Sequence, residues 1–420
     1  MIKKFTLNNG IRVVLAPLKE IQSVTILVLF KVGSRYEEKR LSGVSHFIEH
    51  LFFKGTKKRP APLLLSKELD GLGAEYNAFT AKDHTGYYIK VNREKLEAAM
   101  ELISDMLHNS LFDPAEIAKE RGVIIEEINM FEDNPIMYIE DLFEQICFSG
   151  SSLGEIISGP KENIRKITRA EIIRYKEKFY QPGNLVLGIA GAINPDKLKK
   201  SIEKYFVFDK FRKKPSAFTK FTQVQQRPRL KLKYKDSEQV QVGLGFLALK
   251  NIDPDLMTLY LLSIIIGGNM SSRLFVKIRE ENGLAYYIKA MVNTYEDTGN
   301  LYIQAGLDKR RILEALKYIK AELRSIVNDG VSSEELQRAK EYLKGKLVLR
   351  FEESHNLIQW LGEQLLLTKK IETLAEKIEK INQVKLNDIQ RVAKKIINFS
   401  KLNLAIIGPF KEKSYFNKII

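Results

Sequence analysis

Two of the five histidines in this sequence lie four positions apart, in residues 46–50, which read HFIEH. On an α-helix, positions i, i+3 and i+4 share one face, so both imidazoles and the Glu49 carboxylate point the same way. Two imidazoles and one more protein ligand can hold a catalytic zinc ion with one position open for water. His46 and His50 are therefore candidate ligands, and Glu49 is the candidate base that activates this water. The alternative is a surface helix that carries two histidines by chance, which their scarcity disfavours.

A third protein ligand is expected among the acidic residues of segment 120–131, which reads ERGVIIEEINMF. In helical phase, the residues three and four positions from Glu127 are all apolar, whereas those around Glu126 are mixed. A carboxylate on an apolar face should be buried and should need a compensating cation. We therefore predict Glu127 as the third ligand and Glu120, two turns earlier on the same stripe, as a supporting carboxylate. The alternative is that Glu127 only forms a salt bridge with a neighbouring lysine.

The elements that must hold these residues occur twice in the chain. Segments 168–191 and 385–408 share a helix, a loop and an apolar strand that ends in glycine, at an offset of 217 positions. We predict a zinc-bearing catalytic domain at 1–209, a basic linker at 210–235 and a homologous, substrate-contacting domain at 236–420. The second half lacks a metal site, because the positions that match His46, Glu49, His50 and, with a drift of two residues, Glu127 are Ser263, Ile266, Gly267 and Lys346.

Each half mixes strands and helices unevenly. The patterns predict strands at 12–16, 24–30 and 85–91 and helices at 44–53, 94–108 and 114–131. Helices that follow one another without a strand between them argue against a doubly wound parallel sheet. We predict an α+β fold in which each of two homologous domains is a mostly antiparallel sheet with helices packed on one face.

The amino-acid composition argues against several classes of protein. The 420 residues carry 68 Lys and Arg against 52 Asp and Glu, a net charge of +16, but ten of the basic residues lie in 210–235, which holds no acid. No nucleic-acid reader motif accompanies this charge. The single cysteine, Cys147, excludes a disulfide framework. No apolar run approaches the roughly 20 residues of a membrane span, and no signal peptide is visible. We expect a cytoplasmic protein that binds neither nucleic acid nor membrane.

Five further motifs lie along the chain: LNNGIRVV at 7–14, HFIEHLFFKGT at 46–56, GAEYNAFTAKDHTGYY at 73–88, FYQPGN at 179–184 and GGNMSSRLF at 267–275. Together they resemble the pitrilysin family, which includes insulin-degrading enzyme, mitochondrial processing peptidase and small two-domain bacterial relatives. The motif at 46–56 is the diagnostic one, and the others agree with it. The resemblance implies that His46, His50 and Glu127 bind one Zn²⁺ per chain and that Glu49 is the catalytic base.

The resemblance also implies residues that contact the substrate. Segment 278–287, IREENGLAYY, is similar to the family's second-half substrate element, which implies that Arg279 and Tyr286 hold the scissile carbonyl and the developing oxyanion. Segment 74–80, AEYNAFT, is similar to an edge strand that pairs with extended substrate, with the contacts at Asn77 and Ala78. From the residues alone, Arg279 would be a surface arginine and Tyr286 a half-buried strand residue.

The resemblance has consequences for assembly and substrate. Long relatives carry four such domains in a clam-shaped chamber, and this chain carries two, which implies half of such a chamber. It implies a homodimer, or a heterodimer with a homologous chain, in which Arg279 and Tyr286 act on the neighbour's zinc. The expected substrates are peptides or unfolded segments. One alternative is a catalytically silent structural subunit, which the intact residues His46, Glu49, His50 and Glu127 disfavour. The other is a nucleic-acid-binding protein that uses the basic segment.

Overall fold

The computed structural model describes residues 2–208 and 217–420. The chain forms two compact units, and each takes one segment from the other half of the sequence. The domains that we predicted at 1–209 and 236–420, by contrast, are each one continuous stretch of the sequence. None of the helices in the described ranges is both long and apolar enough to span a membrane. Unit 1 comprises Met1–Ile128, Ile156–Thr219 and Val348–Glu372, and unit 2 comprises Asn129–Glu155, Lys220–Leu347 and Thr373–Ile420.

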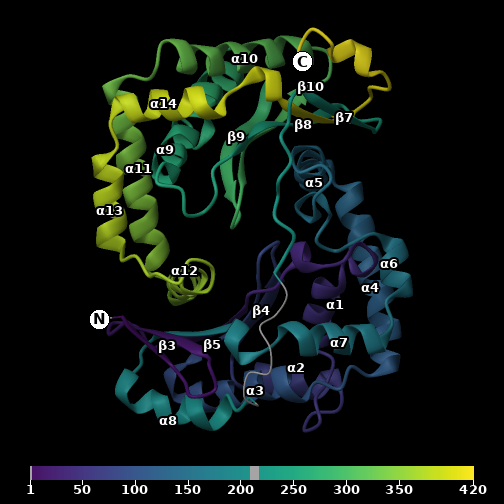
Figure 1. Ribbon diagram of the computed structural model, residues 1–420, viewed down its shortest axis with the longest axis vertical. Coiled ribbons are helices and arrows are strands. Elements are labelled where there is room, and N and C mark those ends of the chain that lie inside the picture. The colour runs from purple at the N-terminus through teal and green to yellow at the C-terminus, as the bar shows by residue number, and fades with distance from the viewer. Residues whose placement is uncertain (1, 209–216) are drawn as a thin grey trace. The chain divides into compact units, whose positions relative to one another are not determined.

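The sheet of unit 1 has the strand order β1-β2-β6-β3-β5-β4. Figure 1 labels its strands β3, β5 and β4. All neighbouring strands are antiparallel except β2 and β6. The central strands β3 (Ser23–Phe30) and β6 (Leu185–Gly191) are apolar along almost their whole length because both faces of the sheet are covered. At one edge, β4 (Glu75–Thr80) pairs with β5. The other strands are β1 (Lys3–Thr6), β2 (Arg12–Pro17) and β5 (Thr85–Asn92).

Helices cover both faces of this sheet. The larger core lies on the face that packs against α1, α3, α4, α7 and α8. The opposite face packs against α12 (Ser354–Leu367), whose Ile358 and Leu361 are fully buried. At Gly188 of β6, a Cβ atom would lie 2.6 Å from Ile358, so this close approach requires glycine. The other helices of unit 1 are α1 (Val44–Leu51), α2 (Pro62–Gly71), α3 (Leu96–Asn109), α4 (Pro114–Asp133) up to Ile128, α6 (Lys161–Lys166), α7 (Arg169–Phe179) and α8 (Pro195–Tyr205).

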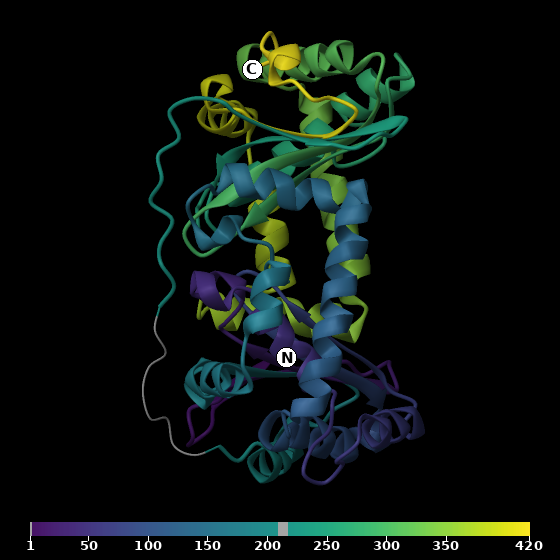
Figure 2. The same cartoon turned by 90° about the vertical axis from the view of Figure 1, so that its right-hand side faces the viewer.

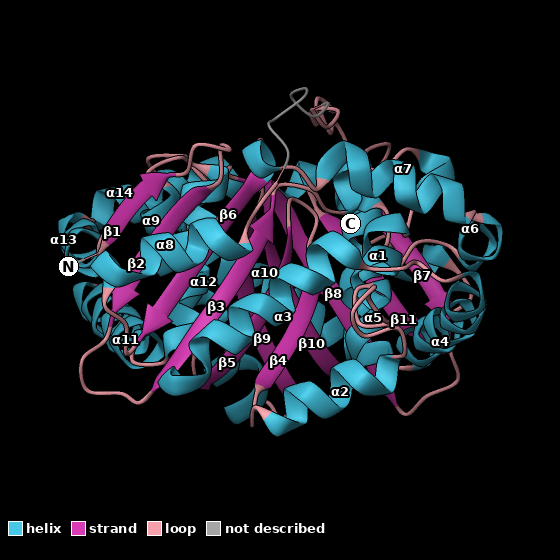
Figure 3. Cartoon of the chain, turned by 90° about the horizontal axis from the view of Figure 1, so that it is seen from below, coloured by secondary structure: helices cyan, strands magenta, loops and turns pink. Residues whose placement is uncertain are grey.

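Unit 2 repeats this plan with five strands in the order β7-β11-β8-β10-β9. One face packs against α9, α10 and α14. On the other face, α5 (Pro135–Cys147) lays Phe143 against Tyr302 of β10, with ring centroids 4.7 Å apart. Figure 3 shows the strands of both units in magenta and their helices in cyan. The elements are β7 (Arg229–Tyr234), β8 (Gln239–Ala248), β9 (Ala285–Thr294), β10 (Gly299–Asp308), β11 (Asn403–Gly408), α9 (Leu256–Gly267), α10 (Ile312–Asn328), α11 (Ser333–Phe351), α13 (Leu374–Gln383) and α14 (Leu386–Ile396).

The helices on the second faces come from the other half of the sequence. Helices α11 and α12 begin at 333 and 354, each 219 positions after the starts of α4 at 114 and α5 at 135. Figure 2 shows α4 as one continuous helix. Unit 1 therefore receives α12 from the second half, and unit 2 receives α5 from the first. The predicted α+β class with mostly antiparallel sheets is confirmed, and each sheet carries one additional helix on its second face.

Part of the segment that we predicted as a linker is strand β7. Its basic side chains alternate with leucines and turn towards α5: Arg229 donates to the carbonyl of Ile146 at 2.5 Å, and Lys233 lies 3.8 Å from the Tyr138 ring centre. A cation beside the last carbonyls of a helix is stabilising. The alternation RLKLKY is that of a strand, and the run of basic residues concealed it. Residues 210–216 of the predicted linker lie outside the described residues.

Candidate metal centre

The short helix α1 presents His46, Glu49 and His50 from one side of its axis. Its apolar residues, among them Phe47 and Ile48, are fully buried in the core of unit 1. The two imidazole rings lie 4.7 Å apart between centroids and nearly perpendicular to each other, at 73°. Burial of the apolar face thus fixes the direction in which both imidazoles point.

Glu127 of α4 brings a carboxylate to these two rings. Its Oε2 lies 3.6 Å from Nε2 of His46 and 3.4 Å from Nε2 of His50. One ligand atom from each residue lies within 4.8 Å of the other two. A tetrahedral zinc ion with bonds of about 2.0–2.1 Å keeps its ligand atoms about 3.3–3.5 Å apart. The two nitrogen–oxygen distances lie close to this value, and two imidazole nitrogens with one carboxylate oxygen are a donor set that suits a catalytic zinc ion.

The face of α4 around Glu127 is more open than its apolar sequence predicts. Val123 is 50% exposed and Met130 is 56% exposed, whereas Ile124 is fully buried. The Glu127 side chain itself is 29% exposed. The expectation of a deeply buried carboxylate is therefore wrong, because Val123 and Met130 do not pack into a core. Glu127 is nevertheless less exposed than Glu126, as the helical phase predicts, since Glu126 is exposed and Glu127 is half-buried.

Glu120, two turns before Glu127 on α4, supports His50. Its Oε2 lies 3.1 Å from Nδ1 of His50, and its Oε1 lies 2.8 Å from Nζ of Lys54. The residue is 4% exposed. Burial raises the pKa of the Glu120 carboxyl, but the bonds to His50 and Lys54 outweigh it and leave the pKa below its usual range. An ionised Glu120 that accepts from Nδ1–H directs the other ring nitrogen, Nε2, towards Glu127.

The two imidazoles differ in proton affinity. Burial and the neighbouring His50 lower the pKa of His46 to about 4. For His50, burial lowers the pKa, but the bonds to Glu120 and Glu127 prevail and raise it to about 9. His50 therefore holds its second ring proton more tightly than His46 does. A ligand imidazole must be neutral, so zinc binding requires His50 to release this proton.

Glu49 lies beside the ligands and bonds to another element. Its Oε2 accepts a hydrogen bond of 2.5 Å from Oγ1 of Thr80, the last residue of β4. Burial raises the pKa of Glu49, while the bond from Thr80 opposes the shift. A carboxylate with a raised pKa that one hydroxyl holds in place suits a general base.

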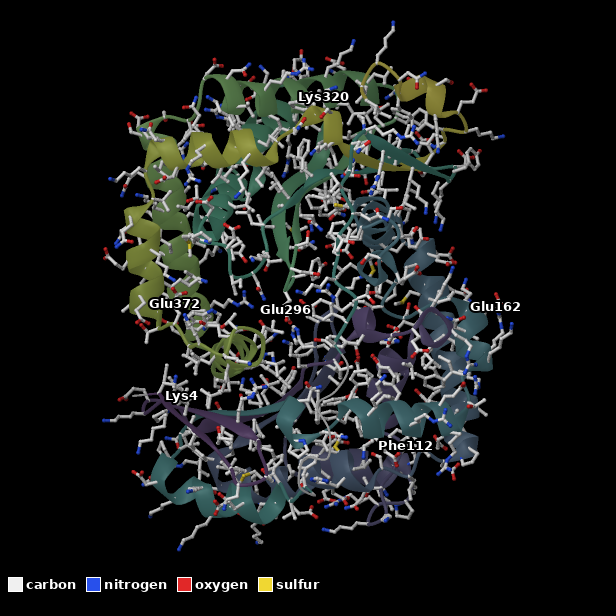
Figure 4. All side chains as sticks on the ribbon, in the orientation of Figure 1. Lys4, Phe112, Glu162, Glu296, Lys320 and Glu372 are labelled. Atoms are coloured by element: carbon white, nitrogen blue, oxygen red, sulfur yellow. The ribbon has the colours of Figure 1, made fainter. Side chains whose placement is uncertain are left out.

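The segment just before α4 contains a residue with an unusual backbone conformation. Phe112, labelled in Figure 4, has φ of 47°, a value that large side chains rarely adopt. Its ring lies 5.8 Å from that of Phe52, next to α1, and its carbonyl accepts from Nε of Arg169 at 2.7 Å. The two helices that carry the candidate ligands are thus joined through Phe112 and Phe52.

The predicted substrate strand is the edge strand β4. Asn77 is exposed and Ala78 is buried at the pairing with β5. The Asn77 side-chain oxygen accepts from the backbone N–H of Ala78 at 2.9 Å, so that N–H is already bonded. Edge strands offer free backbone groups to an extended peptide.

Arg279 and Tyr286 both belong to unit 2. Arg279 lies in a helical turn, Phe275–Glu280, with its guanidinium 4.8 Å from the Phe275 ring centre. Tyr286, near the start of β9, is 76% exposed. An exposed tyrosine on an edge strand makes few contacts within its own unit and is free to contact another molecule.

Comparisons with known proteins agree with this arrangement. The family described as insulinase (peptidase family M16) matches residues 12–161, and the peptidase M16 inactive domain matches residues 166–343. A Bacillus subtilis protein named uncharacterized zinc protease YmxG is 35% identical over 97% of this chain and 98% of its own length. The chain belongs to peptidase family M16. The predicted pitrilysin-type family is confirmed.

Other M16 proteins support the same assignment. A Rickettsia felis protein named as a zinc protease is 35% identical, with 96% of each chain covered. The crystal structure of a protease from Helicobacter pylori has a TM-score of 0.91 at 24% identity and covers 97% of this chain and 99% of its own. It establishes the fold alone. Zinc is the metal of the M16 family, and the His46, His50 and Glu127 group offers it a matching donor set.

Two residues at the site were not predicted. Lys54 lies four positions after His50, so helical spacing could have suggested that it shares this side of the chain. Thr80 bonds to Glu49 across 31 positions, and no local pattern indicates that contact.

Proposed function

We propose that this chain is a zinc-dependent endopeptidase that hydrolyses peptides or unfolded segments. One observation carries the proposal: His46, His50 and Glu127 each offer a ligand atom within 4.8 Å of the others, and the Glu49 carboxylate lies on the same short helix as both histidines. This is the donor set of a hydrolytic zinc site with a base beside it.

The residues divide the chemistry between them. When bound, zinc supplies a Lewis acid that polarises the peptide carbonyl and acidifies water. Glu49 takes one proton from the attacking water as the water oxygen bonds to the carbonyl carbon. The same carboxyl then gives that proton to the amide nitrogen as the C–N bond breaks. Glu120 keeps the His50 ring oriented throughout, since it accepts from Nδ1.

We further propose that Arg279 and Tyr286 act from the partner chain of a homodimer, or of a heterodimer with a homologous chain. A guanidinium and a phenol can both donate to a carbonyl oxygen that gains negative charge. The support is the resemblance at 278–287 and the exposure of Tyr286. The substrate would pair with β4 in extended conformation, and Asn77 would rotate to release the N–H of Ala78.

Activity on an unstructured peptide tests the enzyme assignment. We expect cleavage that a chelator abolishes and zinc restores. Glu49→Gln should lose cleavage while it retains zinc, because Glu49 moves a proton and does not ligate. Wild-type protein that is loaded with zinc and cleaves none of a broad peptide library would favour the second candidate, a silent structural subunit. The match of 166–343 to the M16 inactive domain supports that role for the second half only.

Mixing two inactive variants tests the shared site. His50→Ala removes a ligand in one chain, and Arg279→Ala removes the carbonyl donor in the other. If the site is shared between chains, mixed dimers regain one complete site and recover part of the activity. No recovery after confirmed subunit exchange would exclude sharing.

A further inference from the structure

The first turn of α1 is held by a carboxylate from the preceding loop. Oε2 of Glu37 accepts from the backbone N–H of Gly43 at 2.7 Å, and Oε1 accepts from that of Ser45 at 2.7 Å. The first N–H groups of a helix have no partner within the helix. Glu37 supplies partners to two of them, although it lies outside the helix and six and eight positions upstream of these donors.

The residue directly before α1, where a capping side chain usually stands, cannot carry one. Gly43, the residue before the helix, has φ of 99°, and a Cβ atom there would lie 2.5 Å from the carbonyl oxygen of Ser158. A Cβ atom on Gly159 would lie 2.2 Å from the carbonyl oxygen of Ser42. The usual capping position therefore has no room for a serine or an aspartate, and the cap comes from Glu37 instead.

A second contact holds the first turn of α1 in place. The hydroxyl of Ser45 lies 3.1 Å from the hydroxyl of Tyr175 on α7. Glu37 is 9% exposed as a residue, and Ser45 and Tyr175 are buried. Burial raises the pKa of Glu37, while the backbone N–H bonds that both of its oxygens accept from Ser45 and Gly43 oppose the shift and favour the ionised carboxylate. Because this region is buried, water does not readily supply acceptors for the N–H groups of Gly43 and Ser45 if Glu37 is removed.

The position of this turn matters for the metal ligands. Ser45, whose N–H bonds to Glu37, directly precedes His46, and Glu49 and His50 follow within one further turn. Helix α1 has eight residues, and helices of such length are not stable alone in water. Its orientation therefore depends on contacts at its ends and on its apolar face. Metal ligands tolerate displacements of about 0.5 Å.

We propose that Glu37 is a positioning residue of the metal site: by accepting from Gly43 and Ser45 it fixes the first turn of α1, and with it the direction of His46 and Glu49. Glu37 contacts neither ligand. The inference concerns zinc binding and, where it concerns catalysis, rests on the proposed function.

Two substitutions at Glu37 test this role. Glu37→Gln keeps the shape but presents an amide NH₂ to one of the two backbone donors. Glu37→Asp keeps both acceptor oxygens on a shorter arm. Zinc affinity is measured by competition with a chelator, and kcat and KM on a peptide. We expect Glu37→Gln to weaken zinc binding about tenfold or more and to lower kcat with little change in KM. Glu37→Asp should lie between Glu37→Gln and wild type.

Matched controls separate positioning from general stability. Glu376→Gln removes another carboxylate cap, an exposed one, which accepts from Thr373 N–H at 2.6 Å at the start of α13 in unit 2. Leu198→Ala destabilises the core of unit 1 through a residue that is 7% exposed. Both should keep wild-type zinc affinity.

A Glu37→Gln protein that melts earlier but binds zinc as wild type does would overturn the proposal. If that variant does not fold, a folded Glu37→Asp protein with wild-type zinc affinity and kcat would overturn it equally. Zinc affinity tests the positioning role of Glu37 even if the wild-type chain cleaves no peptide. Failure of the proposed peptidase function is therefore distinguished from failure of this inference.

Discussion

Removal of the Glu120 carboxylate should weaken zinc binding without removing a ligand. In Glu120→Gln, the side chain that accepts from Nδ1–H of His50 at 3.1 Å becomes an uncharged amide with a single acceptor oxygen, and Lys54 loses its charged partner at 2.8 Å. Loss of such a supporting hydrogen bond costs about 10- to 100-fold in metal affinity, or about 1.4–2.7 kcal/mol. Because Glu120 is 4% exposed, water does not readily replace it. The fold should also lose about 1–3 kcal/mol of stability.

Chelator competition on the purified protein measures the change in zinc affinity directly. Glu116→Gln is the matched control, because Glu116 lies on the same helix and pairs with Lys119 at 2.5 Å, away from the ligands. This control should bind zinc as tightly as wild type. A Glu120→Gln protein with wild-type zinc affinity and an intact fold would refute the assignment of Glu120 to the orientation of His50.

Three other perturbations test the fold and the electrostatics. Leu361→Ala on α12, fully buried against the sheet of unit 1, should cost about 2–5 kcal/mol in urea unfolding, and a loss near zero would contradict this packing. Bonds from Arg273 at 2.6 and 2.8 Å hold the pKa of Glu335 below its usual range, so the pair stabilises the fold above the unfolded pKa of about 4.3 and loses this effect as pH falls. Glu335→Gln should therefore cost about 1 kcal/mol at pH 7 and much less near pH 3, and an equal loss at both would contradict the sign. Gly43→Ala should lower the melting temperature, because its Cβ would lie 2.5 Å from the Ser158 carbonyl oxygen, and an unchanged melting temperature would contradict this close approach.

Local periodicity was enough to predict the parts of the site that lie on one helix. His46, Glu49 and His50 share a side because the spacing of three and four positions is a property of any helix. The spacing also singled out Glu127 over Glu126, but for a reason that only partly holds. Exposure of the Glu127 face depends on what packs against α4, and a sequence pattern does not contain that information.

Contacts between distant segments could not be predicted. An apolar stripe on α12 shows that the helix packs against something, but not that it packs on the sheet of the first half. The strand β7 was concealed because its alternating basic residues bind α5, a partner from the other half of the sequence. The bond from Thr80 to Glu49 likewise exists only once β4 lies beside α1.

The zinc content of purified protein, measured together with protein concentration, tests the central claim most directly. The account predicts one zinc ion per wild-type chain, one in Glu49→Gln, and almost none in a folded Glu127→Ala protein. A folded Glu127→Ala protein that retains one zinc ion with wild-type affinity would contradict a site built from His46, His50 and Glu127.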